Sequence, residues 1–502
     1  MQFHIPYYSY LAQCSSKRLA LYQAIRDCIT SQVLVMETKL PSSRELADLY
    51  GLSRGTVSEV YAMLASEGYI TSGVGRGTFV SFQSPKQKGN EFPRQELHLL
   101  SDWGVRLKEL QEQQTEPSEK IKVQIGAGQR AVNFQEFGPG IQAFPDKEWN
   151  RCLYAQARLL TNGERRSRMG STLGDEALRD SIAQYLRRAR GIAAKASQIV
   201  IFNGSKQALA LAAHLFINPG DHVVVESPGY RGVIDVFRAQ GGKCIHAPVD
   251  GQGIIPDKWK AKLLFVTPNR QFPTGAVLIM ERRQQLLAWA SENNALILED
   301  DYDSVFRHRG KSLEPLKVLD SEGRVIYIGS FSNTLLPHIR IGYAVLPSSL
   351  VEVFAHAKAA FEPSPSNLLE QRTLASWMNN GQYERHLRRM KRIYGRKFKL
   401  LRELLTAKLS SWFQWVEGDA GLSIFGWWNG TADQYVQFRS NCLAAGIMWS
   451  ETCIEEQADR HGIRCGAYFY FPRLSEEEIV YGVNRMQAIG LDLIPESVKL
   501  KE

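Results

Sequence analysis

The chain has 502 residues, more than one folding core accommodates, and this length predicts about two to four domains. A composition of 44% hydrophobic and 23% charged residues excludes an intrinsically disordered chain, and the longest apolar run, near residues 208–217, is too short to span a bilayer. The seven cysteines include no C-x-x-C pair, so neither a disulfide framework nor a zinc site is indicated, and we expect a cytoplasmic protein without membrane contact.

The formal net charge of +9 suggests an acidic partner but does not locate its site. Residues 1–82 hold seven Lys or Arg and six Asp or Glu, so this segment is close to neutral. The densest basic run lies at 385–402, where apolar residues recur at helical spacing. This pattern favours a solvated amphipathic helix over a second nucleic-acid contact.

The first 82 residues predict a winged helix-turn-helix domain. Apolar residues recur every four positions over 19–33, which predicts a first helix. Ser42 and Glu45 have the spacing of a capping box, which would start a short second helix, and Gly51 would end it. A turn then leads into a third helix, as the motif requires.

The third helix is expected to begin at Ser53 as N-cap, with small polar side chains and one arginine facing outward. Such a surface suits phosphates and base edges. Residues 69–80 then predict a β-hairpin whose glycine-rich tip carries one cation, as expected of a wing in the minor groove. This order of elements indicates DNA binding, with a winged helix used only for protein contacts as the alternative.

The stretch from Leu40 to Val80 closely resembles the N-terminal domain of GntR-type regulators. The resemblance implies that a double-stranded DNA operator is the partner. Carried over by motif, that family's DNA contacts would fall on Arg44, Ser53, Arg54, Thr56, Ser58, Gly75 and Arg76.

Residues 83–132 are polar and charged without a sustained period, which predicts a linker, although residues 99–103 could dock locally. From residue 133 to 495, short β-branched runs alternate with amphipathic stretches. This alternation predicts an α/β domain with a mostly parallel sheet covered by helices. The expected organisation is therefore a small winged helix-turn-helix domain, a linker and a large α/β domain.

Two segments of the large domain follow predicted strands and carry polar side chains. The strand at 198–202 ends in N-G-S-K-Q and opens a helix, a combination that suits an anion, although an ordinary strand-to-helix turn is the alternative. The apolar strand at 295–298 ends in a cluster of carboxylates, where ligands bind in open α/β sheets. Solvated loop acids are the alternative here.

Together with E-S-P-G-Y at 226–230, T-P-N-R-Q-F-P-T-G at 267–275 and G-S-F-S-N-T-L at 329–335, these segments resemble fold-type I pyridoxal phosphate aminotransferases. The resemblance covers about residues 133–495. Joined to the GntR-like domain, it gives the architecture of the MocR/GabR family of transcription regulators, and it implies a homodimer.

The resemblance also implies roles for single residues. Asp300 would pair with the pyridine nitrogen of the cofactor, Tyr302 with its phenolic oxygen, and Tyr230 would stack on the ring. Arg464 would bind a substrate carboxylate, for which guanidinium is suited. The cofactor phosphate would be surrounded by Ser205, Lys206, Ser330, Ser332 and Arg340.

Three positions depart from the aminotransferase pattern. The lysine of G-[ST]-F-S-K, which forms the Schiff base with the cofactor, is Asn333, and an amide can neither form an imine nor shuttle the proton of transamination. The pattern T-P-S-H-Q has Arg270 in place of its histidine, and a tyrosine usually found before the L-R-x-x-I-A helix is Met169. Lys206 and Arg270 are expected to make the pocket suitable for an anionic ligand, or for pyridoxal phosphate held without a covalent bond.

The sequence therefore predicts a DNA-binding transcription regulator whose large domain senses a small anionic ligand, pyridoxal phosphate or an amino-acid-related effector, without turnover. A pyridoxal-phosphate-dependent aminotransferase with an accessory DNA-binding domain is the first alternative, and Asn333 argues against it. The second is a regulator whose large domain only dimerises. Retained Asp300, Tyr302, Arg340 and Arg464 favour ligand binding over that reading.

Overall fold

A computed structural model describes residues 4–73, 77–82, 100–114, 130–140, 144–161, 171–308, 310, 313–455 and 463–493. The chain divides into two compact units, residues 1–99 and residues 100–502. Among the described helices, none combines the length and apolar character needed to cross a membrane.

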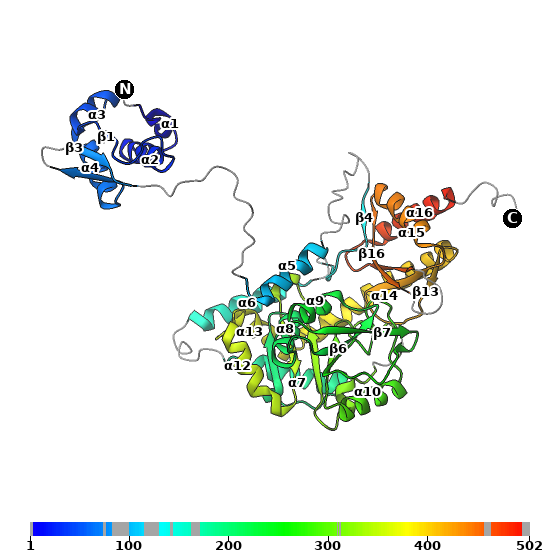
Figure 1. Cartoon of the computed structure of the whole chain (residues 1–502). Helices are drawn as coiled ribbons and strands as arrows, with labels where there is room; N and C mark the ends of the chain where they lie inside the picture. The colour runs from blue at the N-terminus through cyan, green and yellow to red at the C-terminus, as the bar shows by residue number, and fades with distance from the viewer. Residues whose placement is uncertain are drawn as a thin grey trace. The chain divides into compact units, whose positions relative to one another are not determined.

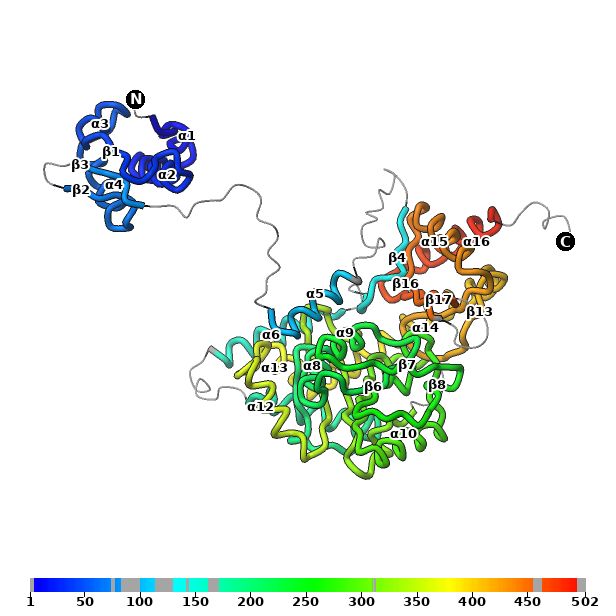
Figure 2. Tube along the Cα trace, viewed as in Figure 1, coloured from blue at the N-terminus to red at the C-terminus, as the bar shows by residue number. Residues whose placement is uncertain are grey.

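The first unit has the winged helix-turn-helix architecture that the sequence predicts (Figure 2). Its strands form one sheet of three in the order β1-β3-β2, and β2 and β3 make the predicted hairpin. The elements are α1 (Tyr7–Leu11), α2 (Lys17–Thr30), β1 (Lys39–Leu40), α3 (Ser43–Tyr50), α4 (Arg54–Ser66), β2 (Ile70–Gly73) and β3 (Gly77–Val80).

Side-chain caps fix the ends of α3 and α4. The Ser42 hydroxyl accepts a hydrogen bond from the Glu45 amide while the Glu45 carboxylate accepts one from the Ser42 amide, so the predicted capping box is present. Gly51 follows α3 with φ of 63°, a left-handed conformation that glycine adopts without strain. The Ser53 hydroxyl caps α4 by accepting from the Thr56 amide. Local sequence therefore determines where both helices begin.

The predicted linker contains a helix, α5 (Asp102–Gln114), that belongs to the second unit. The Arg106 Nε donates a hydrogen bond of 2.8 Å to the Ala239 carbonyl, and the Trp103 ring lies 6.4 Å from that of His214. The helix was not predicted because its sequence has no strong amphipathic period; contacts with residues more than 100 positions away stabilise it.

The second unit is built around an eight-stranded sheet in the order β5-β12-β11-β10-β9-β6-β7-β8. Strands β11, β10, β9, β6 and β7 pair in parallel, whereas β12, β5 and β8 join by antiparallel pairing, so the sheet is mostly parallel as predicted. The strands are β5 (Ile199–Phe202), β6 (His222–Ser227), β7 (Lys243–Asp250), β8 (Gly253–Ile254), β9 (Leu263–Val266), β10 (Leu296–Asp301), β11 (Val325–Ser330) and β12 (Gly342–Val345).

Helices cover this sheet on both faces (Figure 1). Side chains alternate along a strand, and in β5 Ile199 and Ile201 join one apolar cluster while Val200 and Phe202 join another. The helices are α6 (Asp146–Thr161), α7 (Glu176–Arg190), η2 (Ala196–Gln198), α8 (Ser205–Phe216), α9 (Arg231–Ala239), α10 (Met280–Glu292), α11 (Leu316–Leu319), η3 (Pro337–Ile339), η4 (Ser348–Leu350), α12 (Val351–Phe361) and α13 (Leu368–Asn379).

The C-terminal part of the second unit adds a four-stranded antiparallel sheet in the order β13-β14-β17-β16. The basic run forms the long helix α14, whose buried stripe includes Met390, Tyr394 and Phe398 and leaves Arg388 and Arg389 exposed, so the predicted amphipathic helix is confirmed. A short parallel pair joins β4 to β15. The remaining elements are β4 (Val132–Asn133), α14 (Gln382–Leu409), β13 (Phe413–Trp415), β14 (Ser423–Trp428), α15 (Ala432–Ala444), β15 (Ile447–Met448), β16 (Ser450–Glu455), β17 (Ile463–Tyr470) and α16 (Glu476–Asp492).

Candidate functional site

The predicted DNA-contacting side chains lie at the start of α3 and α4. Val57, Val60 and Leu64 of α4 are fully buried in the core, which turns the opposite face outward. On that face Arg54 and Ser58 are exposed, and the Ser53 and Thr56 hydroxyls lie 2.8 Å apart at the helix start. Arg44, beside the cap of α3, is also exposed, whereas Gly75 and Arg76 lie outside the described residues.

The second unit contains a cavity of about 1170 Å³ at the carboxyl ends of its parallel strands. Segments far apart in the sequence contribute to it, from Phe137 to strand β17. The predicted residues that line it are Ser205, Lys206, Tyr230, Asp300, Tyr302, Ser330, Ser332, Asn333 and Arg340. The structure therefore brings all the predicted cofactor-contacting side chains together, while Arg270 and Arg464 do not line this cavity.

One side of the cavity collects hydrogen-bond donors and cations. Ser205 begins α8, where backbone amides and the helix dipole favour an anion. The Arg340 guanidinium reaches this helix start so closely that a Cβ on Gly204 would lie 2.5 Å from its Nη2. Ser330 and Ser332 line the same cavity; the Ser332 amide donates to the Ser330 hydroxyl, which donates to the Ser332 hydroxyl at 2.9 Å. This arrangement can hold a phosphate.

The floor of the cavity is acidic, with Asp300 and Asp303 among its lining residues. Asp300 is 6% exposed, and its Oδ1 accepts no hydrogen bond from any residue that the structure describes. Burial, and after it the charges of the neighbouring acids, raises the pKa of Asp300 to about 8. An orphaned carboxyl oxygen in a cavity fits a ligand that presents an N–H group or a cationic nitrogen there.

Asn333 stands where the aminotransferase pattern has lysine, and both ends of its amide are engaged. Its Nδ2 donates a 3.0 Å hydrogen bond to the Tyr302 carbonyl, and the Tyr470 hydroxyl donates one of 3.2 Å to its Oδ1. The amide therefore links the ends of β10 and β17 at the cavity wall.

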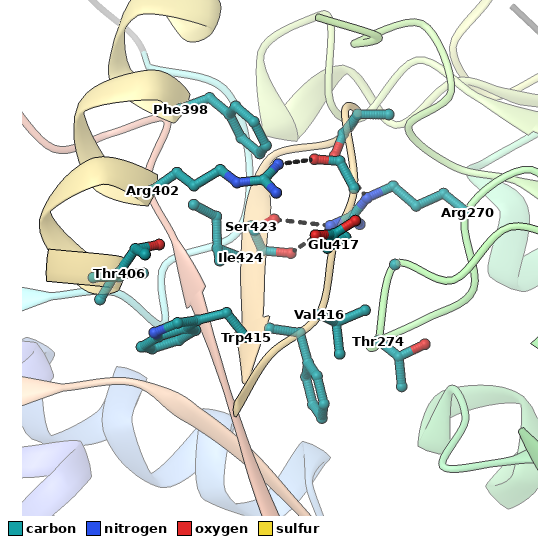
Figure 3. Close-up of a pocket in the computed structure, with 15 residues that line it drawn as sticks. Arg270, Thr274, Phe398, Arg402, Thr406, Trp415, Val416, Glu417, Ser423 and Ile424 are labelled. Atoms are coloured by element: carbon teal, nitrogen blue, oxygen red, sulfur yellow. Dashed lines mark hydrogen bonds between the residues drawn. The ribbon is translucent and has the colours of Figure 1, made fainter. Parts of the chain in front are cut away.

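Arg270 differs from the prediction that it adds positive charge to the ligand cavity. It is 5% exposed and forms an ion pair of 3.0 Å with Asp303, and its guanidinium also donates to the Tyr302 hydroxyl. Its remaining donors reach the Ala420 carbonyl and the carbonyl and hydroxyl of Ser423, as Figure 3 shows in part. All five N–H groups of the arginine are therefore used inside the protein. Histidine, with two ring nitrogens, could not make these contacts.

Arg464, the predicted carboxylate ligand, lies on β17 with its guanidinium 4.4 Å from the centre of the Trp427 ring. It shares the cavity-facing side of the strand with Tyr468 and Tyr470, because alternate residues of a strand face the same way. The stacked position shows where the side chain rests, and its role toward a ligand stays a prediction.

An aromatic wall of the cavity was missed in the sequence. Phe272 lies at its centre, with ring centroids 5.9 Å from Tyr230, 5.8 Å from Tyr302 and 5.5 Å from Tyr468. Phe137 extends the wall, 4.9 Å from the Tyr470 ring. The only local signal was the alternation of tyrosines in β17, which resembles ordinary core packing. The wall favours a ligand with a flat apolar part.

Comparison with known proteins agrees with this geometry. Residues 17–80 match the family model for bacterial regulatory proteins of the gntR family, and residues 141–453 match that for aminotransferases of class I and II. The chain is 33% identical over 478 residues to the probable rhizopine catabolism regulatory protein MocR of Rhizobium meliloti, covering 94% of this chain and 93% of the relative.

Two further proteins show the same two relationships. The pyridoxine biosynthesis transcriptional regulator PdxR of Corynebacterium glutamicum is 30% identical over 388 residues, covering 77% of this chain and 78% of that protein. The crystal structure of kynurenine aminotransferase from Pyrococcus horikoshii superposes with a TM-score of 0.67 at 24% identity, covering 77% of this chain and 97% of that one. The second likeness is one of fold.

Proposed function

Since the chain belongs to the MocR/GabR family of transcription regulators, in which a GntR-type winged helix is joined to an aminotransferase-like domain, we propose that its cavity binds a small anionic effector without turning it over. The regulator contacts operator DNA through the exposed start of α4 and the hairpin β2–β3. Effector binding changes the spacing or orientation with which the two winged helices of a homodimer contact the two half-sites of the operator.

The chemistry of the cavity supports pyridoxal phosphate, or an adduct of it with an amino acid, as the effector. Ser205, Ser332 and Arg340 would hold the phosphate, and the orphaned Asp300 oxygen would face the ring nitrogen. When bound, this group supplies an electron sink for amino-acid chemistry. The relative PdxR carries pyridoxine biosynthesis in its name, which is compatible with a vitamin B6 compound as the signal.

The absence of turnover is inferred from one observation, which is that Asn333 occupies the position of the Schiff-base lysine. Its amide has no nucleophilic amine to bind the cofactor covalently and no titrating proton to transfer at neutral pH. The hydrogen bonds to the Tyr302 carbonyl and from the Tyr470 hydroxyl hold the amide in place. These residues position and enclose a ligand; none of the three supplies the lysine's proton transfer.

The alternative of an aminotransferase with an accessory DNA-binding domain requires a lysine, or another proton-transferring amine, at the position of Asn333. The alternative of a pure dimerisation scaffold leaves the buried Asp300 Oδ1 without a hydrogen-bond partner among the described residues, at a cost in stability that ligand binding would offset. The effector-binding reading accounts for both residues.

The test is an absorbance spectrum and an intact-mass measurement of the full chain, with and without added pyridoxal phosphate. We expect binding that dialysis reverses, with no mass adduct after borohydride reduction. The matched variant Asn333→Lys is expected to gain a visible band and a borohydride-fixed adduct, since it restores the amine. An adduct on the chain with Asn333 would refute the proposal, and no binding to either protein would point to another anion or to a scaffold.

The regulatory part is tested with the same preparations. We expect pyridoxal phosphate to change the mobility of the protein on operator DNA, or its footprint, at the concentrations that saturate the cavity. If pyridoxal phosphate binds to the cavity and the DNA complex does not change, the cavity has a storage or scaffold role and does not sense the effector.

A further inference from the structure

Cys453 and Cys465 lie directly opposite each other on the antiparallel strands β16 and β17. Their sulfur atoms are 2.9 Å apart, and both side chains are free thiols. All seven cysteines lie in the described part of the chain, and these two are the ones whose thiols are in contact with each other. No sequence motif marks them, because the register of the sheet brings them together.

This placement suits a disulfide. Directly opposed residues of an antiparallel pair have Cα atoms about 4.5–5.5 Å apart, within the range of about 4.4–6.8 Å that disulfides span. Because the two sulfurs already touch, bond formation requires little movement of either strand. Strand β16 is also at the edge of its sheet, so its backbone has room to adjust.

The two thiols differ in access. Cys453 is exposed and lines the large cavity, while Cys465 is 4% exposed. A small oxidant reaches Cys453 first, and Cys465 stands behind it as the resolving thiol. The other buried cysteines, such as Cys442, have no such arrangement.

We propose that Cys453 and Cys465 form a redox modification site at the rim of the ligand cavity, with a peroxide as the oxidant. The Cys453 sulfur attacks one oxygen of hydrogen peroxide, the O–O bond breaks, and a sulfenic acid and one water form. The Cys465 sulfur then attacks the Cys453 sulfur, the S–O bond breaks, and the second water leaves with the thiol proton. The two thiols together lose two electrons, and these electrons reduce the peroxide to two waters.

The disulfide would fix β16 against β17, and both strands line the cavity. Glu451, Thr452 and Ile454 of β16 face it together with Tyr468 and Tyr470 of β17. Oxidation therefore changes the freedom of one cavity wall. The inference rests on the thiols alone, so it holds or fails independently of the proposed effector.

Although the residue as a whole is exposed, the atoms packed around its sulfur, and after them the hydrogen bond with Cys465, raise the pKa of the Cys453 thiol to about 12. Since the thiolate is the nucleophile, the reaction is slow at neutral pH and its rate is expected to rise about tenfold per pH unit between pH 7 and 9. This pH dependence distinguishes attack by Cys453 from oxidation of methionine, which has no thiolate to form.

The experiment treats the reduced full chain with hydrogen peroxide and then counts thiols, measures intact mass and maps peptides without reduction. We expect the loss of two thiols per chain, a mass decrease of two hydrogen atoms, a Cys453–Cys465 linked peptide, and reversal by dithiothreitol. The exposed substitution Cys453→Ser is expected to abolish these changes, and the remote Cys442→Ser is expected to keep them.

Three results would overturn the proposal. They are oxygen addition to Cys453 without a cross-link, a disulfide between chains, or the same thiol loss in Cys453→Ser. A melting curve of each variant, compared with the parent chain, shows whether the protein tested is folded. Pyridoxal phosphate affinity of the reduced and oxidised chains then measures the coupling to the cavity, and equal affinities would limit the site to modification without regulation.

Discussion

Arg270 and Asp303 form a buried ion pair, with 3.0 Å between Nη1 and Oδ2 and side-chain exposures of 5% and 2%. Asp303 lines the ligand cavity, and the arginine also joins the end of β10 to β14 through Tyr302 and Ser423. A charge that has been removed from water is stabilised only while its partners are in place.

Arg270→Met is therefore expected to lower the free energy of unfolding of the second unit by about 3–5 kcal/mol, because Asp303 would remain buried without its partner. The measurement is urea unfolding followed by tryptophan fluorescence. The matched control is Lys262→Met, whose ion pair with Asp221 has a lysine side chain 56% exposed and is expected to cost about 1 kcal/mol or less. Equal losses in the two variants would contradict the structural role of Arg270.

Asp300 should make stability pH-dependent in the unliganded chain. Its folded-state pKa of about 8 exceeds the ordinary value of 3.8, so between these values the folded chain holds a proton that the unfolded chain has released. The free energy of unfolding consequently falls as pH rises through this window.

Asp300→Asn removes that contribution. We therefore expect the free energy of unfolding of the variant to rise relative to that of the parent chain as pH increases from 5 to 8, by up to about 1.4 kcal/mol per pH unit. Urea unfolding at several pH values checks it. The exposed Asp257→Asn is the control and should leave the slope unchanged. A parallel pH dependence of Asp300→Asn and the parent chain would show that Asp300 is charged throughout.

Arg54→Ala is expected to abolish specific operator binding, because the exposed arginine at the start of α4 is placed to reach phosphates or base edges. A mobility-shift titration at fixed salt checks the affinity, and size-exclusion chromatography checks that the oligomeric state is unchanged. Arg26→Ala serves as the control, since this arginine on α2 is paired with Asp27. Unchanged DNA affinity of Arg54→Ala would mean that α4 is not the recognition helix.

Gly204→Ala tests the anion-binding side of the cavity. The added Cβ would lie 2.5 Å from the Arg340 Nη2, so the guanidinium must move, and we expect pyridoxal phosphate to bind at least about tenfold more weakly, as for the loss of a charged hydrogen bond. Gly220→Ala is matched to it, because Gly220 has φ of +91° against +87° and open space around its Cβ position. Both variants should lose similar stability through backbone strain, while only Gly204→Ala should lose affinity in calorimetry.

The sequence predicted those features that a few neighbouring residues determine, and those side chains that the fold class places together at strand ends. The Ser42–Glu45 capping box and the Ser53 cap are encoded within four residues, so the helices of the first unit could be predicted. Asp300 comes from a strand end, and carboxyl ends of parallel strands meet at one edge where ligands bind, so its place in the site followed from the predicted topology, whereas Ser330 was assigned through the resemblance to aminotransferases.

Prediction from the sequence failed where a contact depends on register or on distant backbone. The partners of Arg270 at Ala420 and Ser423 are about 150 residues away in the chain, so its charge could be counted but not located. Cys453 and Cys465 meet only because β16 and β17 pair in one particular register. Helix α5 depends on its contact with the Ala239 carbonyl rather than on an internal period.

The hydrogen bond from Arg270 to the Tyr302 hydroxyl also sets the direction of a proton. Because the phenol oxygen accepts from the guanidinium at 2.8 Å, its own hydrogen points away from Arg270, and burial raises the pKa of Tyr302 so that the hydrogen stays on. On the same floor, the Oδ1 of Asp300, which has no hydrogen-bond partner among the described residues, presents an acceptor. The cavity thus discriminates by donor and acceptor pattern as well as by charge, because it favours a ligand that brings a lone pair to the Tyr302 hydroxyl and an N–H group or a cationic nitrogen to Asp300.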